Sequence, residues 1–139
     1  MSNMDEKKAM EKKYMEFQII GQRMKQLQQQ IVLVNNQLTE LAALQQNLVE
    51  LKDVKENTKV LMPFGNGIYM SAELKSPGEL LVNVGSGVVV KKDIDSTKQI
   101  IMQQESEMRD VNEQMMTELK LLYERATSLE QELQTVNSE

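Results

Sequence analysis

The sequence predicts an α+β protein, a long antiparallel two-helix coiled coil with two central β-hairpins that join other chains in an oligomeric β platform. Apolar residues repeat at helical spacing on both sides of the chain's middle, while both prolines and five of the six glycines lie within it. Aromatic residues are only 4% of the chain, a composition that suits a helix seam better than a thick core. We expect one domain, residues 1–139, with helices over 5–56 and 93–138 and hairpins over 57–92.

The first helix is predicted by apolar residues at alternating spacings of three and four, the pattern of a coiled-coil seam. This stripe consists of Phe17, Ile20, Met24, Leu27, Ile31, Val34, Leu38 and Leu41. Gln45 occupies the next expected position. We therefore expect an offset stripe over Leu44, Leu48 and Leu51, which changes the supercoil locally.

The middle of the chain reads as two successive hairpins. "VLMPF" (60–64) and "IYMSAEL" (68–74) flank the triplet "GNG", and "ELLVNV" (79–84) and "VVVKK" (88–92) flank "GSG". Apolar runs separated by glycine-containing triplets are hairpin signals. We prefer turns to phosphate-binding loops, because neither triplet has the additional residues of a nucleotide motif.

The last helix carries an apolar residue at every seventh position, namely Ile94, Ile101, Met108, Met115, Leu122, Leu129 and Val136. The expected partners are Val111 and then Leu119, Ala126 and Leu133, so the stripe shifts by one residue. "STKQ" (96–99) has capping-box spacing, and Asp93 and Asp95 also favour a helix start. Capping is preferred to a calcium loop, since Lys98 and Gln104 replace the glycine and glutamate that such a loop needs.

The hairpins are predicted to be assembly elements. Two-stranded ribbons are marginal alone, and "VVV" and "ELLV" place apolar residues on both faces of a strand. With both helices packed on each other, the cover for these strands is expected from other chains. The two helices then run antiparallel, and their free ends form what we call the tip.

Charge and composition argue against several classes of function. The net charge of −5 disfavours a broad nucleic-acid contact, and the lack of histidine and cysteine removes the common zinc ligands and catalytic triads. We expect no enzyme activity, cofactor or metal. For the basic stretch "KKAMEKKY" (7–14), neutralisation by Glu130, Glu132 and Glu139 is preferred to the alternative of a nucleic-acid contact.

The tip is rich in methionine and aromatic residues, whose adaptable surfaces suit variable partners. Met10, Tyr14 and Phe17 are expected in the seam, which leaves Met15 and Ile19 exposed. Frayed ends with some seam packing are the plainer alternative. The candidate tip contacts are Met10, Tyr14, Met15, Phe17, Ile19, Leu129, Leu133 and Val136.

The order helix, two hairpins, helix resembles the alpha-class subunit of prefoldin, archaeal type. The resemblance is carried by "VLMPFGNGIYMSAEL" (60–74) and "ELLVNVGSGVVVKKDIDST" (79–97), with Met62 and Phe64 around the proline as departures. It implies a hexamer of two alpha and four beta subunits on a double β-barrel. The assembly residues are then Val60, Leu61, Met62, Phe64, Ile68, Tyr69, Met70, Leu80, Leu81, Val82, Val84, Val88, Val89 and Val90.

The resemblance also implies an ATP-independent holdase that captures unfolded proteins at the coiled-coil tips and transfers them to a group II chaperonin. The alternatives are a structural coiled-coil scaffold or filament-forming prefoldin-like protein, and a regulatory binding module in transcription. No apolar signal core or membrane span is evident, so we expect a cytoplasmic protein.

Overall fold

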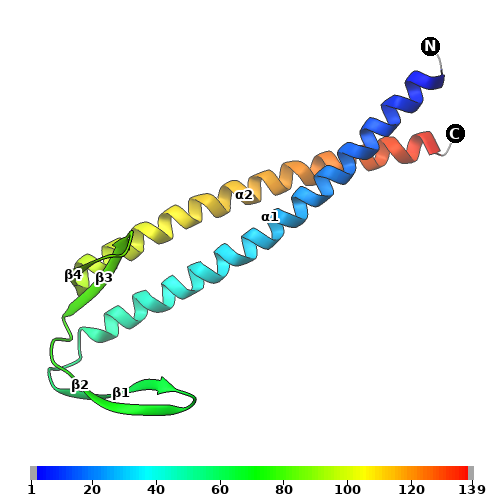
Figure 1. Ribbon diagram of the computed structural model, residues 1–139. Helices are drawn as coiled ribbons and strands as arrows, with labels where there is room; N and C mark the ends of the chain where they lie inside the picture. The colour runs from blue at the N-terminus through cyan, green and yellow to red at the C-terminus, as the bar shows by residue number, and fades with distance from the viewer. Residues whose placement is uncertain (1–2, 138–139) are drawn as a thin grey trace. The chain divides into compact units, whose positions relative to one another are not determined.

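The computed structural model describes residues 3–137, with side chains as far as Thr135. The elements in chain order are α1 (Asn3–Leu51), β1 (Thr58–Gly65), β2 (Ile68–Leu74), β3 (Glu79–Gly85), β4 (Val88–Asp93) and α2 (Ile94–Asn137) (Figure 1). This is the expected fold of two long helices and two hairpins. Neither helix, over its described length, is long and apolar enough to cross a membrane.

The chain forms two compact units. One, the helical unit, contains residues up to 37 together with those from 108 onward, and the other, the hairpin unit, contains residues 38–107. Within the helical unit, α1 and α2 run antiparallel. The ion pairs show this, since Lys13 pairs with Glu132 and Arg23, further along α1, pairs with Glu118, earlier on α2. Within the hairpin unit, the end of α1 pairs with the start of α2, where Lys52 contacts Asp95.

The seam of α1 follows the predicted stripe as far as Leu41 and then continues through Gln45 and Leu48. Gln45 is half-buried, and its Nε2 donates a hydrogen bond of 2.9 Å to the backbone oxygen of Lys98. Leu48 is buried, whereas Leu44 is 39% exposed. The offset stripe was therefore wrong at Leu44, because the Gln45 amide finds a carbonyl on α2 and keeps the seam position. Its other two members, Leu48 and Leu51, pack in the apolar cluster as expected.

The seam of α2 likewise keeps its register where a shift was expected. Val111 is 48% exposed, and Asn112 takes the seam position instead. The Asn112 Nδ2 donates a 3.3 Å hydrogen bond to the Asn35 Oδ1. The prediction failed for the same reason as at Gln45, because it assumed that every seam position is apolar.

The helix boundaries differ from the expected ones by a few residues. α1 ends at Leu51 rather than 56, and its last turn tightens through backbone bonds from Lys52, Asp53 and Val54 to residues three positions earlier. α2 begins directly after Asp93, whose Oδ1 accepts the Ser96 N–H at 2.7 Å. Asp93 is thus the N-cap and "STKQ" is not a capping box. Hydrogen bonds from the Ser96 backbone and side chain, together with the positive charge of Lys92, lower the pKa of the Asp93 carboxyl.

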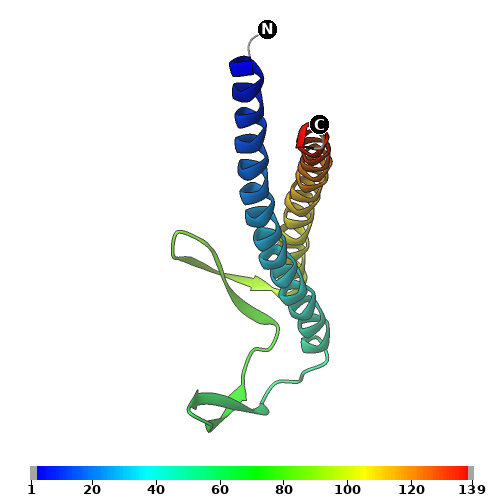
Figure 2. The same cartoon turned by 90° about the vertical axis from the view of Figure 1, so that its right-hand side faces the viewer.

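The two hairpins share one local design. β1 pairs antiparallel with β2, and β3 with β4, in two separate sheets (Figure 2). The turns Asn66-Gly67 and Ser86-Gly87 have positive φ at both residues, 48° and 77° in the first and 52° and 75° in the second, as tight type I′ turns require. In the first strand of each hairpin the pairing register shifts just before the turn. The shift lies between Pro63 and Gly65 in β1 and between Asn83 and Gly85 in β3.

A small apolar cluster holds the hairpin unit together. Leu48, Ile94 and Ile101 are its buried members, and Leu41, Leu51 and Leu80 pack against them. Leu80 belongs to β3, so the second hairpin is anchored on the helices at its base. The expectation that the chain leaves both hairpins entirely uncovered is therefore wrong for this end of β3.

The corrected register is tested by two alanine substitutions on α1. Leu48→Ala is expected to lower the free energy of unfolding by about 2–5 kcal/mol, because it opens a cavity in the apolar cluster. Leu44→Ala should change it by no more than about 0.5 kcal/mol, as for an ordinary surface site. Urea unfolding followed by circular dichroism measures both. Equal losses in the free energy of unfolding for the two variants would show that Leu44 packs in the seam, as the offset stripe predicted.

Candidate functional site

The exposed apolar side chains of the hairpins form the first candidate surface. Leu61, Phe64 and Leu81 are 68%, 71% and 70% exposed. The other exposed members of the predicted assembly set are Met62, Ile68, Tyr69, Met70, Val84, Val88 and Val89. Val60, Leu80, Val82 and Val90 are half-buried. We call the exposed members of the set the assembly surface.

The register of β1 and β2 places apolar residues on both faces of the first hairpin. Met62 lies opposite Met70, and Pro63 lies opposite Tyr69 on the other face. Side chains alternate between faces along a strand, so no single covering layer reaches all of them. The second hairpin differs, because Leu80, Val82 and Val90 share its half-buried face while Leu81 and Val89 lie on its exposed face.

The tip is the second candidate surface, and it belongs to the helical unit. Met15 and Ile19 are 60% and 63% exposed, as predicted from the seam. Met10 and Phe17 are half-buried in the seam. Tyr14, expected in the seam as well, is 55% exposed, because Lys13 takes the seam position and pairs through its Nζ with the Glu132 Oε2 at 3.3 Å.

Of the predicted tip contacts, Leu129 needs correction and Val136 lies outside the described side chains. Leu129 is fully buried between the helices, so its side chain belongs to the seam and is not available to a ligand. The side chain of Val136 lies outside the described residues. Leu133 is half-buried and lines a groove of about 520 Å³ with Lys7, Met10, Glu11, Tyr14 and Met15. The sequence did not reveal this groove, because its walls come from both helices.

Two ion pairs join the helices on one side of the helical unit. The Arg125 Nε and NH2 groups donate to the two Glu16 carboxylate oxygens at 2.8 and 3.2 Å. Arg23 donates to Glu118 in the same two-pronged way, at 2.9 and 3.1 Å. Each guanidinium, by hydrogen bonding and charge, lowers the pKa of its carboxyl partner, while the carboxylates raise the arginine pKa values.

The basic stretch at 7–14 is neutralised in part as expected. Lys13 contacts Glu132, one of the three predicted acidic partners. Glu139 lies outside the described residues. Among the residues that the structure describes, no three acidic, histidine or cysteine side chains gather in a way that would hold a metal ion.

Comparison with known proteins decides which family this arrangement represents. A family model described as "Prefoldin subunit" matches residues 20–139. The chain belongs to the prefoldin subunit family. Prefoldin subunits are chaperone-type proteins, and the order of helices and hairpins described above is the one that the sequence resemblance implied.

Archaeal prefoldin alpha subunits are among the relatives of this chain. "Prefoldin subunit alpha" of Methanobrevibacter smithii is 34% identical over 94 residues, which are 68% of this chain and 64% of the relative. The match thus spans just under two thirds of that prefoldin. The Thermofilum pendens protein of the same name is 24% identical over 115 residues, 83% of this chain and 89% of the relative. These names agree with the alpha class recognised from the hairpins.

The fold agrees with a solved prefoldin structure. A chain from the cryo-EM structure of filamentous PFD from Methanocaldococcus jannaschii has a TM-score of 0.76 and covers 86% of this chain and 98% of its own length. Its sequence identity is 16%, so the likeness concerns the fold alone.

The bidentate pairs predict how stability of this prefoldin chain depends on pH. Because the folded-state pKa values of Glu16 and Glu118 are lowered, their contribution is present above the usual glutamate pKa and is lost as the pH falls through the lowered values. The melting temperature should therefore decrease when the pH is lowered from about 7 to about 3. A variant with both Arg23→Gln and Arg125→Gln should lose part of this pH dependence.

Circular dichroism melts at the two pH values measure the effect. Added salt should weaken it in the parent chain, because the pairs are exposed to solvent. An unchanged pH dependence in the double variant would show that these pairs do not contribute.

Proposed function

We propose that this chain is an ATP-independent holdase subunit that captures unfolded proteins with its tip and assembles through its hairpins. The observation that carries the proposal is the presence of two apolar surfaces in separate compact units: the tip in the helical unit and the assembly surface in the hairpin unit. A protein that must both oligomerise and bind variable partners needs two such surfaces.

The assembly surface supports oligomerisation with other prefoldin subunits. Six exposed apolar residues in one small hairpin exceed what a monomer leaves in contact with water, and uncovered strand edges invite further strands. The proposed partners are prefoldin beta subunits, in a hexamer of two alpha and four beta chains built on a β-barrel platform. The family relationship supports this composition.

The tip supports binding of non-native chains. Met10, Tyr14 and Met15 line its groove, and methionine moulds to many apolar surfaces without demanding one shape. Each contact is weak, so retention of a client requires several tips on one platform, where effective concentration multiplies the affinity. Release to a group II chaperonin then needs only competition, without nucleotide hydrolysis.

A filament-forming protein is the alternative, because one solved structure with this fold comes from a filamentous assembly. Native mass spectrometry with and without a co-expressed beta-class subunit separates the two. The holdase proposal expects one closed hexamer mass with the partner. A ladder of increasing masses would favour the filament.

The assembly surface is tested by Leu61→Glu with Tyr69→Glu, which places charges on one face of the first hairpin. We expect the hexamer to dissociate into smaller species, because buried carboxylates without partners are costly. Val49→Glu is the control, since this apolar residue is exposed on α1 in the same unit. A hexamer that survives the double change contradicts the assembly role.

The tip is tested by Met15→Glu with Ile19→Glu. Aggregation suppression of several unrelated denatured proteins should fall severalfold while the hexamer mass remains unchanged. Leu33→Glu serves as the matched control, because Leu33 is equally exposed on the same helix but does not line the tip groove. Full activity of the tip variant would eliminate the tip as the client site, whereas an equal loss in the control would point to surface charge alone.

A further inference from the structure

We propose that the helical unit has a second binding site, a side groove that takes a short, extended, apolar segment of a non-native polypeptide flanked by acidic residues. This inference rests on the proposed holdase function. The groove lies between α1 and α2 and measures about 510 Å³. Its apolar lining is Met24, Ile31, Val32, Met116, Leu119 and Tyr123.

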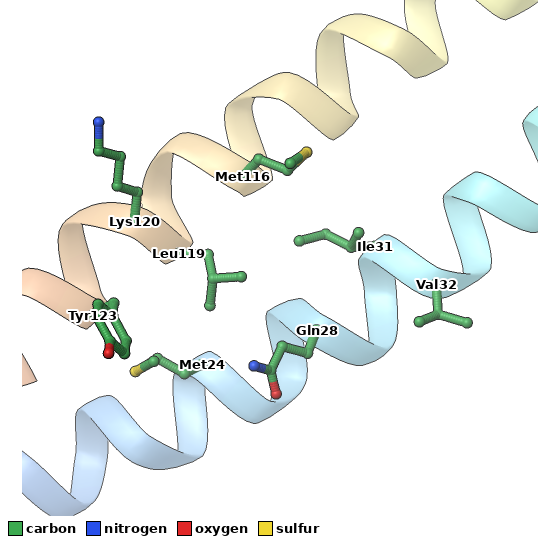
Figure 3. A pocket seen from close by; sticks show the side chains of 8 residues that line it. All are labelled: Met24, Gln28, Ile31, Val32, Met116, Leu119, Lys120 and Tyr123. Carbon is green, nitrogen blue, oxygen red and sulfur yellow. The ribbon is translucent and has the colours of Figure 1, made fainter.

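The side groove and the bidentate ion pairs lie on opposite sides of the seam. At about 100° per residue, Arg23 and Gln28 fall on either side of the seam pair Met24 and Leu27. Glu118 and Tyr123 flank Leu119 and Leu122 in the same way on α2. One side is therefore closed by Arg23–Glu118 and Arg125–Glu16, while the other opens between the helices, with Met24, Leu119 and Tyr123 converging in the gap (Figure 3).

The exposed members of the lining are not needed to hold the helices together. Val32, Met116 and Tyr123 are 57%, 55% and 63% exposed. Seam packing is provided instead by residues such as Leu27, which is fully buried. The groove thus presents apolar side chains, including two methionines and an aromatic ring, that contact water until something covers them.

The size of the groove selects a short segment over a second copy of the chain. A standard protein–protein interface uses about 20–30 residues on each side, far more than line this groove. Its volume suits a few side chains and lies within the range of about 300–1,000 Å³ typical of ligand pockets. An extended apolar segment fits because its alternate side chains enter the groove while Gln28, at the edge, meets its backbone amides.

Charge selects the flanks of the segment. Lys120 is the sole charged residue in the lining, and the chain as a whole carries a net charge of −5. The neighbouring hollow, which shares Met116 and Lys120, adds Arg109 and Glu113, whose charges are opposite. The groove edge is therefore locally basic on an acidic protein, and a carboxylate beside the apolar segment complements it.

The test uses the assembled hexamer and fluorescein-labelled peptides of about a dozen residues, with one apolar core and acidic, neutral or basic flanks. Fluorescence anisotropy gives the dissociation constants. The groove variant Val32→Glu with Tyr123→Glu should weaken binding about tenfold. The matched control is Leu33→Glu with Leu121→Glu, whose parent residues are 62% and 60% exposed but lie outside the groove.

Flank preference is measured in the same way. The parent hexamer should bind the acidic peptide about twofold to fivefold more tightly than the basic one, and Lys120→Glu should reverse that order. A photo-crosslinker at position 123, but not at position 121, should attach to the acidic peptide. Together these results support the groove site.

Other outcomes would contradict the groove site, and they differ from the outcome that would reject the proposed holdase function. Equal losses in the groove and control variants, or crosslinking equally at both positions, would show a nonspecific apolar surface. Binding lost only with Met15→Glu and Ile19→Glu would remove the groove and leave the tip function standing. A groove variant that loses only self-association would identify a second copy as the occupant. No binding or aggregation suppression by the parent hexamer would instead reject the proposed function itself.

Discussion

Two antiparallel strands cannot enclose an interior, and this geometric limit governs where the chain leaves its apolar surface. In the first hairpin, Met62 and Met70 lie on one face while Tyr69 lies on the other, so folding of one chain cannot bury both. The second hairpin solves the problem in part by sending Leu80 into the cluster around Leu48 and Ile94. The proposed assembly would cover the remaining surface with strands of other chains.

The coiled coil combines an apolar seam with a few polar contacts that specify alignment. Gln45 reaches a backbone oxygen across the seam, and Asn112 reaches Asn35. Polar residues in a seam lower stability but disfavour shifted registers, because a slip would bury their groups without partners. Arginine–glutamate forks reinforce alignment on one side, since a fork matches a carboxylate in one geometry only. The opposite side is left free for apolar side chains.

The sequence was sufficient for the element order, the hairpin turns and most of the seam, because glycine placement and heptad spacing are local signals. It misplaced Leu44 and Val111, since spacing alone does not show that the amides of Gln45 and Asn112 find partners on the other helix. The heptad stripe placed Leu129 in the seam, where the structure buries it, so only its inclusion among the tip contacts was wrong. The grooves lined by both helices were missed, because they depend on packing between segments that are distant in the chain.

The two hairpins have the same turn and the same shift before it, so the proposed assembly gives each subunit two similar elements for pairing with neighbours. If each hairpin pairs with a neighbouring subunit, every subunit contacts two others. Whether such linkage ends in a ring or continues as a fibre depends on whether successive rotations close, not on the chemistry of the bonds. In the proposed assembly, the segment around Pro77 and Gly78 sets this rotation, because it is the short connection between β2 and β3.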